Sequence, residues 1–323
     1  MKRYVECDPT LQPPSHRCRD AKKVRFEPEG FSILLQFLGN VDRFAYVAYG
    51  QPMLNMRMKR SGFFLRPVVV EDADAIAEKV FLDIDVAKTL MHDVSTPEKA
   101  RECADGWCSF FAIDSTDEDH CDPGLGLWAI CQPDGNGEPG SLVGVRGLFH
   151  DPALPANSAE GFAAISKSHW GRGLSSESSE ILLRYAFEEL ELSAVFTNIW
   201  PLLNPASEAV QRKVGYEYVG RTTVLDSFGA ERIEGVIALE LRRLSDAKED
   251  TKQNVFKEAG IKLGQLSAEE HLTFDAIRRR VADVLPDPQD RELVFDHMSL
   301  GHQNPGWATY RLTREVWETN RRK

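Results

Sequence analysis

The chain has 323 residues, 42% hydrophobic and 28% charged, which is typical of a folded globular protein and not of a disordered one. No apolar run approaches the ~20 residues that span a bilayer, and the N-terminus resembles neither a secretory signal nor a transit peptide. We therefore expect a soluble, cytoplasmic protein that does not bind membranes. The six cysteines form no CxxC pair and match no zinc pattern, so reduced thiols and no metal are expected. The alternative is a metal site that uses Cys108, His120 and Cys121.

The net charge of −11 is concentrated in the middle of the chain. Residues 61–244 contain 15 lysines and arginines against 30 aspartates and glutamates. Such a module repels a phosphate backbone and attracts cations, which argues against a nucleic-acid partner and fits an amine substrate. An ordinary solvated acidic surface would give the same balance.

The first 61 residues are interpreted as an N-terminal extension that is flexible at least over residues 1–30. Beyond it, Phe63–Val70 is rich in β-forming residues and predicts a strand. A helix is expected from Asp72 or Asp74 to about Phe81, and a second from Thr96 to about Phe111, because each start carries a capping residue or a proline at the first position.

The following segments alternate between strand and helix patterns. Two strands joined by a turn-forming stretch predict a hairpin, and three further strands and two helices follow before a last strand. The expected hairpin strands are Leu125–Cys131 and Ser141–Phe149; the later elements are strand Gly161–Ile165, helix Ser175–Leu190, strand Ala194–Trp200, helix Pro205–Val214, and strands Tyr216–Arg221 and Ile233–Leu241. This order predicts a mixed α/β sheet.

Residues 245–254 are polar and charged, and are interpreted as a linker. After them, helices are expected over Ala268–Val284 and Trp307–Asn320, so residues 255–323 are interpreted as a helical C-terminal extension. An apolar face made of Leu272, Phe274, Ile277, Val281 and Val284 predicts that the extension packs against the rest of the protein or a second copy. A flexible tail is the alternative.

The most informative stretch is ISKSHWGRGLSSE, residues 165–177, in which a strand leads through two glycines into a helix. Gly171 and Gly173 allow the backbone to turn so that successive N–H groups point into one space, and the helix N-terminus adds free amides. Such a nest binds a pyrophosphate, and Arg172 could add a charge. A plain connecting loop is the alternative. A dinucleotide site is disfavoured, because Ser176 replaces the third glycine of GxGxxG.

This loop resembles the Q/R-x-x-G-x-G/A loop of the GNAT N-acetyltransferases, and within them the RimJ/RimL-type (ribosomal-protein N-acetyltransferase-like) branch. Trp170 replaces the first Gln/Arg, as is usual in that branch, and Ser175 replaces the small last residue. A second stretch, Asn204 to Tyr216, resembles the family's N-x-x-S-x-x-v-l-e-K-l-G-F in register. The resemblance implies a GNAT domain over residues 62–244, with a mixed, mostly antiparallel sheet flanked by helices.

The resemblance also implies acetyl-CoA as co-substrate. The residues that it places at acetyl-CoA are Ile165, Trp170, Gly171, Arg172, Gly173, Leu174, Ser175 and Asn204. In this family the strand before the loop separates from its neighbour, and its free backbone groups hold the pantetheine arm and the thioester oxygen. By position that strand is Gly161–Ile165, with the amide of Ile165 a candidate donor.

Acetyl transfer to an amine requires a base, and Glu160 is the candidate because the branch often carries a carboxylate at this position. His150 and Asp151 are reserves, and a solvated strand-edge glutamate is the alternative. Many family members place a tyrosine at the position of Gln211 to protonate the thiolate. Glutamine cannot donate this proton, so either Ser207 or water is the proton donor, or the thiolate leaves without being protonated. Asn204 could also be a helix cap.

The function expected is acetyl transfer to a protein N-terminus, a lysine or a small-molecule amine by direct attack in a ternary complex. The alternative is a weak or inactive acyl-CoA-binding scaffold or regulatory protein. The amine itself is not identified by the sequence, since the loops that select substrate vary freely on such a fold. A monomer or a homodimer is expected.

Overall fold

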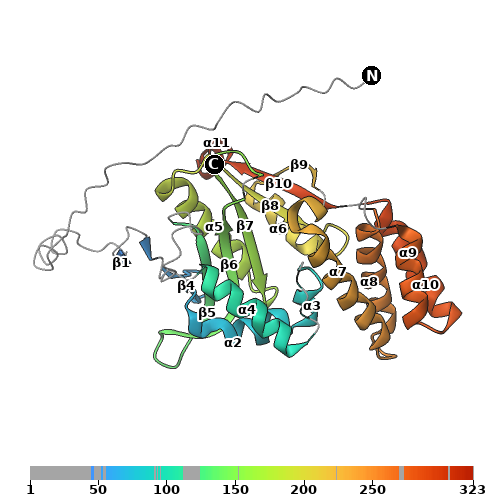
Figure 1. Ribbon diagram of the computed structural model, residues 1–323. Coiled ribbons are helices and arrows are strands. Elements are labelled where there is room, and N and C mark those ends of the chain that lie inside the picture. Colours follow the sequence, from blue (N-terminus) through green and yellow to red (C-terminus); the bar gives the residue numbers. More distant parts are fainter. Residues whose placement is uncertain are drawn as a thin grey trace, which may run out of the picture. The chain divides into compact units, whose positions relative to one another are not determined.

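The computed structural model describes residues 45–46, 52–53, 56–90, 92, 94, 96–111, 124–151, 153–222, 224–268, 273–304 and 306–322 (Figure 1). The chain divides into two units, Met1–Asp42 and Arg43–Lys323. The first unit, and with it the arm expected over residues 1–30, lies outside the described residues, as do His120 and Cys121. In the described part no helix is long and apolar enough to cross a membrane, and no three His, Cys, Asp or Glu are grouped to hold a metal.

An eight-stranded sheet forms the centre of the second unit, in the order β3-β4-β5-β6-β7-β8-β10-β9 (Figure 1). Every neighbouring pair is antiparallel except β7 and β8, which are parallel. The predicted mixed, mostly antiparallel sheet is therefore confirmed. The strands are β3 (Met56–Arg57), β4 (Phe64–Pro67), β5 (Gly126–Pro133), β6 (Pro139–Phe149), β7 (Ser158–Ile165), β8 (Ala194–Ile199), β9 (Glu217–Thr222) and β10 (Trp307–Thr313). A separate pair consists of β1 (Ala45–Tyr46) and β2 (Pro52–Met53).

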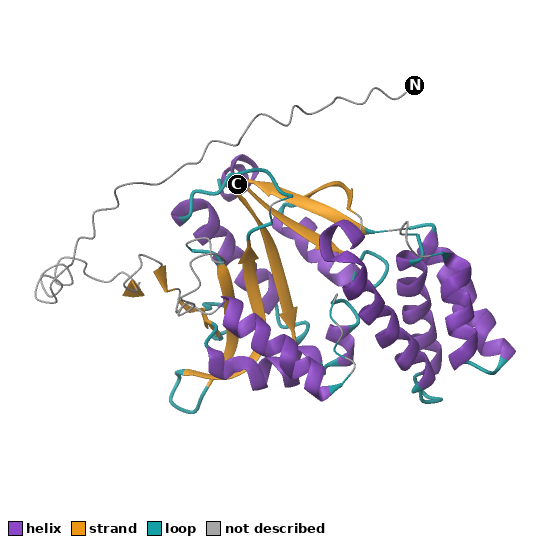
Figure 2. Ribbon diagram, viewed as in Figure 1, coloured by secondary structure: helices purple, strands orange, loops and turns teal. Residues whose placement is uncertain are grey.

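Helices cover both faces of the sheet (Figure 2). The core on one face joins α2 and α4 to inward residues of β5 to β7, and the core on the other face joins α5 to the same strands. These helices and the short turns beside them are η2 (Val70–Asp72), α2 (Ala73–Ile76), η3 (Ala77–Phe81), α3 (Ile84–Ala87), α4 (Pro97–Phe111), η4 (Lys167–His169), α5 (Leu174–Arg184), η5 (Tyr185–Glu189) and α6 (Pro205–Val214). Helix α6 has the bounds predicted for it, because Asn204 caps its start and Gly215, at φ 107°, ends it.

The prediction of a strand over Ile233–Leu241 is wrong, because this segment lies within helix α7 (Val224–Ser245). Its buried residues Ile233, Ile237 and Leu241 recur every four positions, which places them on one face of a helix. That face packs against the helices that follow, so the helical spacing, not the β-forming composition, decides the structure.

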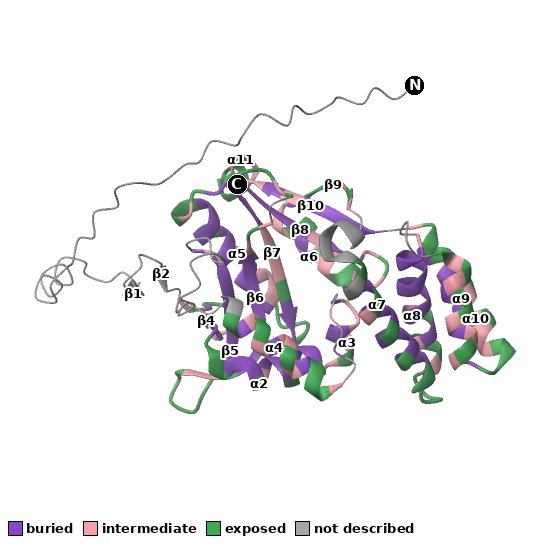
Figure 3. Cartoon of the chain, in the orientation of Figure 1, coloured by how far each residue is buried: buried purple, intermediate pink, exposed green. Residues whose placement is uncertain are grey.

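Three further helices, α8 (Lys252–Leu266), α9 (Phe274–Val284) and α10 (Pro288–His302), form a layer with α7. Figure 3 shows buried residues along α8, and the predicted apolar face of α9 is buried at Ile277 and Val281; Leu272 lies outside the described residues. Helices α8 and α10 approach closely at Gly264 and Gly301. A Cβ at either glycine would lie 2.0 Å from a carbonyl oxygen of the other helix, so a side chain there would force the helices apart.

The helix expected over Trp307–Asn320 is wrong in its first half. Residues Trp307–Thr313 form β10, and only Arg314–Arg321 are helical, as α11. Strand β10 lies between β8 and β9 and pairs with both. The alternating residues Ala308, Tyr310 and Leu312 are buried in the sheet's core. The central sheet therefore includes a strand well beyond the boundary expected at residue 244, and α7 to α10 are inserted between its last two strands.

The inserted helices are held to the segment after α3 by a buried lysine. Lys262 of α8 is fully buried, and its Nζ donates to the carbonyl oxygens of Lys88 at 2.8 Å and Leu90 at 3.0 Å. It also lies 3.3 Å from Oε1 of the fully buried Glu240. The other oxygen of Glu240 accepts a 2.5 Å bond from Arg243. Because burial penalises each isolated charge, these groups are stable in the core only together.

We predict that Lys262→Met lowers the free energy of unfolding by about 3–5 kcal/mol, because two carbonyls and one carboxylate lose a buried partner. Urea unfolding followed by circular dichroism measures the change. Lys257→Met, at an exposed position of the same helix, is the control and should change stability by no more than about 0.5 kcal/mol. Equal stabilities of the two variants would show that the buried lysine does not hold the helices.

Candidate active site

A cavity of about 960 Å³ lies where β7 and β8 stop pairing. The two parallel strands pair only over Ser158–Glu160 and Ala194–Phe196. Beyond this short ladder, Gly161–Ile165 and Thr197–Ile199 line the cavity instead of pairing with each other. The separation expected for the strand Gly161–Ile165 is therefore present in the structure.

The unpaired part of β7 turns backbone groups toward this cavity. The N–H of Ser166 donates to Val143 of β6 at 2.9 Å, and backbone groups alternate in direction along a strand. The amides of Ala163 and Ile165 therefore face the β8 side. The carbonyl of Ile165 accepts a 2.6 Å hydrogen bond from Nε1 of Trp170. The indole thus ties the glycine loop to the end of β7, a role that its sequence position did not reveal.

The glycine loop has the conformation that the sequence predicted. Gly171 and Gly173 have φ values of 74° and 77°, in the left-handed region that only glycine adopts readily. Gly173 is the N-cap of α5, so the first amides of that helix have no partner within it. A Cβ built on Gly173 meets no atom within 4 Å, so the space before the helix is open. Four other loop residues also line the cavity: Trp170, Gly171, Leu174 and Ser175.

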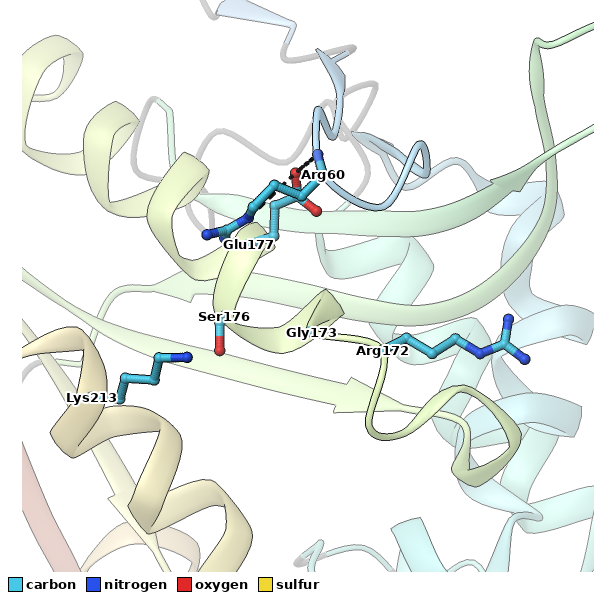
Figure 4. A pocket seen from close by; sticks show the side chains of 6 residues that line it. All are labelled: Arg60, Arg172, Gly173, Ser176, Glu177 and Lys213. Carbon is cyan, nitrogen blue, oxygen red and sulfur yellow. Dashed lines mark hydrogen bonds and ion pairs between the residues drawn. The ribbon is translucent and has the colours of Figure 1, made fainter.

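A smaller cavity of about 240 Å³ lies beside the loop, lined by Arg60, Arg172, Gly173, Ser176, Glu177 and Lys213 (Figure 4). Lys213 of α6 points toward Ser176, whereas Arg172 points away from both. The carboxylate of Glu177 accepts hydrogen bonds from the amides of Arg60, at 2.6 Å, and Ser61, at 3.0 Å. Of these two basic side chains, Lys213 and not Arg172 is therefore directed toward the first turn of α5.

Arg146 of β6 binds the first turns of α5, a contact that was not predicted from the sequence. Its Nε donates to Oγ of Ser178 at 2.8 Å, and Nη2 to the carbonyl of Ser175 at 2.9 Å. Burial lowers the pKa of Arg146 to about 10, so it remains charged at neutral pH. A buried positive charge at the first turn of a helix favours an anion bound at that N-terminus.

Glu160, the predicted base, lines the cavity at the point where the ladder ends. Its partner in β6 is Phe149, and Phe162 is two residues further along β7, so both rings are on the same face as the carboxyl. Desolvation raises the pKa of Glu160 to about 7, with a smaller contribution from the charge of Asp151. The half-buried position differs from the solvated strand edge that was the alternative. Such a pKa suits a group that accepts a proton near neutral pH.

A chain of hydrogen bonds orients Glu160 from the far strands of the sheet. Nδ2 of Asn198 donates to Oε1 of Glu160 at 3.0 Å. Oδ1 of Asn198 accepts from Oγ1 of Thr309 at 2.7 Å, and Thr309 is 2.8 Å from the hydroxyl of Thr222. The bond from Thr309 fixes which end of the Asn198 amide faces the carboxyl. Thr309 belongs to β10, so the C-terminal segment contributes to this site.

Three polar residues of α6 and its cap line the other side of the cavity: Asn204, Ser207 and Gln211. The side chain of Asn204 accepts from the amide of Ser207 at 3.1 Å, so Asn204 acts as a helix cap. Gln211 is buried, and its Oε1 has no hydrogen-bond partner within the described residues. The alternative candidates for the base, His150 and Asp151, are not among the described residues that line the cavity.

Comparison with known proteins assigns the domain. Residues 63–217 match the family model described as the acetyltransferase (GNAT) domain. A search of curated proteins found no match to the chain.

Among solved structures, the chain is similar to a GNAT-family acetyltransferase from Bacillus anthracis, with 20% identity and a TM-score of 0.39 over 52% of this chain and 85% of that one. It is also similar to the ribosomal-protein-S5-alanine acetyltransferase of Vibrio fischeri, with 15% identity and a TM-score of 0.38 over 50% and 83%. A third is the spermidine/spermine N-acetyltransferase of Vibrio cholerae, with 16% identity and a TM-score of 0.36 over 50% and 84%. At these values the family model alone carries the assignment: residues 63–217 form a GNAT acetyltransferase domain.

Proposed function

We propose that this protein transfers an acetyl group from acetyl-CoA to an amine by direct attack in a ternary complex. The observation that carries the proposal is the continuity of one cavity from the glycine loop to Glu160. The loop offers free amides for a pyrophosphate, and Glu160 offers a carboxyl whose pKa is about 7. The unpaired strand ends between them leave room for the pantetheine arm.

The residues present fit acetyl-CoA on two observations. The open space at Gly173, before the first turn of α5, suits a pyrophosphate, with Arg146 and Lys213 as nearby cations. The buried Oε1 of Gln211 lacks a partner among the described residues and lines the cavity, so it can accept an amide N–H of the pantetheine arm. Gln211 then binds the pantetheine arm, at the position where many GNAT enzymes have a tyrosine that protonates the departing thiolate.

Each chemical role has a candidate group. Glu160 accepts the proton of the attacking amine. The amides of Ala163 and Ile165 donate to the thioester oxygen as negative charge develops on it. Ser207, which is half-buried beside the cavity, protonates the departing thiolate, and water is the alternative donor. Asn204 acts through its cap bond, which sets the position of the Ser207 amide.

We also propose that the domain belongs to the RimJ/RimL-type branch. The support is Trp170, at the position where that branch replaces Gln/Arg. The hydrogen bond from its indole to Ile165 gives this exchange a physical reason: a side chain with one donor fixes the loop to β7 and adds no charge to the site.

We predict that CoA raises the melting temperature of the protein, because a ligand that binds only the folded state stabilises it, by about 2.7 kcal/mol at 100 times its Kd. Gly173→Asp should abolish the shift, since a side chain at φ 77° is strained and a negative charge repels the pyrophosphate. Gly135→Asp is the control: Gly135 is in the β5–β6 turn, also with open space around it, and should retain the full shift. No shift for the wild type would overturn the proposal. Binding without turnover on any amine would instead favour the scaffold alternative.

We predict that kcat/KM rises with pH through about 7, because the carboxyl of Glu160 accepts a proton only when ionised, above its raised pKa. Glu160→Gln should lower kcat by ~10²-fold and remove this rise, while the thermal shift with CoA is retained. Initial rates of thiol release between pH 5.5 and 9 provide the profile. If the variant keeps the same rise, the base is another group.

We predict that Thr309→Val raises the apparent pKa of the same profile, because a freely rotating Asn198 no longer holds its donor against the ionised carboxyl. Thr222→Val, which removes only the outermost member of the chain, is the matched control and should shift the pKa less. A profile unchanged in Thr309→Val would mean that β10 does not position Glu160.

A further inference from the structure

The end of the cavity beside Glu160 is lined by aromatic rings. Trp107 is in edge-to-face contact with Phe162, at 5.1 Å between ring centroids, and with His92 at 5.2 Å. Phe149 lies 6.0 Å from Phe162. All four rings line the cavity and are only partly buried by protein. Large rings left partly exposed in a cavity favour an apolar ligand group that covers them.

These rings are brought to the carboxyl by the register of the sheet. Phe149 is paired with Glu160 across β6 and β7, and Phe162 is on the same face of β7. Trp107 comes from α4, which packs on that face, and a fifth ring, that of Phe81, lies 4.8 Å from the ring of Trp107 between centroids. Such interlocked edge-to-face contacts hold Trp107 and Phe162 rigidly, so the surface that they offer is preformed.

The charges of the cavity limit what else the acceptor carries. Among the described residues that line it, Glu160 is the only carboxylate, and none is a lysine or an arginine. A second ammonium group on the acceptor would therefore lose its hydration without gaining an opposite charge from these residues, and a carboxylate would do the same. One amine on an uncharged body fits this lining.

We propose that the acceptor is an arylalkylamine: a primary amine joined by a short chain to an aromatic ring. The ring packs against Trp107 and Phe162, and the amine reaches Glu160. This inference rests on the proposed acetyl transfer and names its substrate class.

The test compares three primary amines at saturating acetyl-CoA: 2-phenylethylamine, spermidine and a peptide with N-terminal alanine. We expect kcat/KM for 2-phenylethylamine to exceed the other two by ~10-fold or more, the discrimination that a fitted apolar group provides. Preference for spermidine or for the peptide would overturn the inference.

A ring-specific variant tests the contact itself. Trp107→Ala should raise KM for 2-phenylethylamine by ~10-fold and change that for butylamine, which has no ring, by less than about 2-fold. Trp107→Phe should restore most of the loss. Phe162→Leu provides the same comparison if Trp107→Ala does not fold. A variant counts as intact if CoA raises its melting temperature as much as it raises that of the wild type. Equal losses for both amines would contradict a ring contact.

Calorimetric titration of 2-phenylethylamine into the CoA-loaded wild type separates this inference from the function on which it rests. Binding that Trp107→Ala weakens, without acetylation of any amine, would overturn the transfer activity and keep the ring site. Acetylation of other amines, with no binding of 2-phenylethylamine, would overturn the ring site and keep the transfer activity.

Discussion

The site depends on the point at which β7 and β8 stop pairing: their parallel ladder ends at Glu160. Three residue pairs hold the strands together, and beyond them the two strands line a cavity. The last paired residue of β7 is therefore a carboxylate at the inner end of the opening, and the other end of β7 leads into the glycine loop. Because backbone groups of unpaired strands need partners, the opening is a polar seam in an otherwise apolar core. A ligand with amide groups along its length suits such a seam.

The helical insertion and the sheet form one structure around this opening. Trp200 and Trp307, whose rings are 4.8 Å apart, belong to the core of α7 to α10 and also line the cavity. Lys262 holds the carbonyls of Lys88 and Leu90 next to another stretch of the wall. The insertion thus fixes two sides of the cavity, and the strand that follows it delivers Thr309 to the hydrogen-bond chain. The cavity and its hydrogen-bond chain thus depend on residues beyond the segment 63–217 that matches the family model.

The two ends of the cavity differ in their electrostatics: one favours negative charge, and the other disfavours it. At the loop, buried Arg146 and the open N-terminus of α5 favour negative charge. At the other end, burial raises the pKa of Glu160 to about 7, and the hydrogen bond from Asn198 opposes this rise because it stabilises the ionised carboxylate. The balance leaves a carboxyl that exchanges its proton near neutral pH. Phe149 and Phe162 lie on the same face of the sheet as Glu160 and belong to the surface proposed to bind the acceptor, so the proposed base and the proposed acceptor surface are adjacent.

Local rules in the sequence determined the segments whose signals lie within a few residues. Proline at its first position and a capping asparagine defined α6, and two glycines before a helix defined the glycine loop, because caps and left-handed turns are made by neighbours in the chain. Ile233–Leu241 was misread because β-forming residues on a helical spacing become helical when other helices cover that face. The strand Trp307–Thr313, the role of Arg146, the chain through Asn198 and the aromatic end of the cavity were decided only by the tertiary structure. Each of these features needs partners from segments that are distant in the sequence. Burial in a common core determines which segments come together, and no local sequence pattern contains that information.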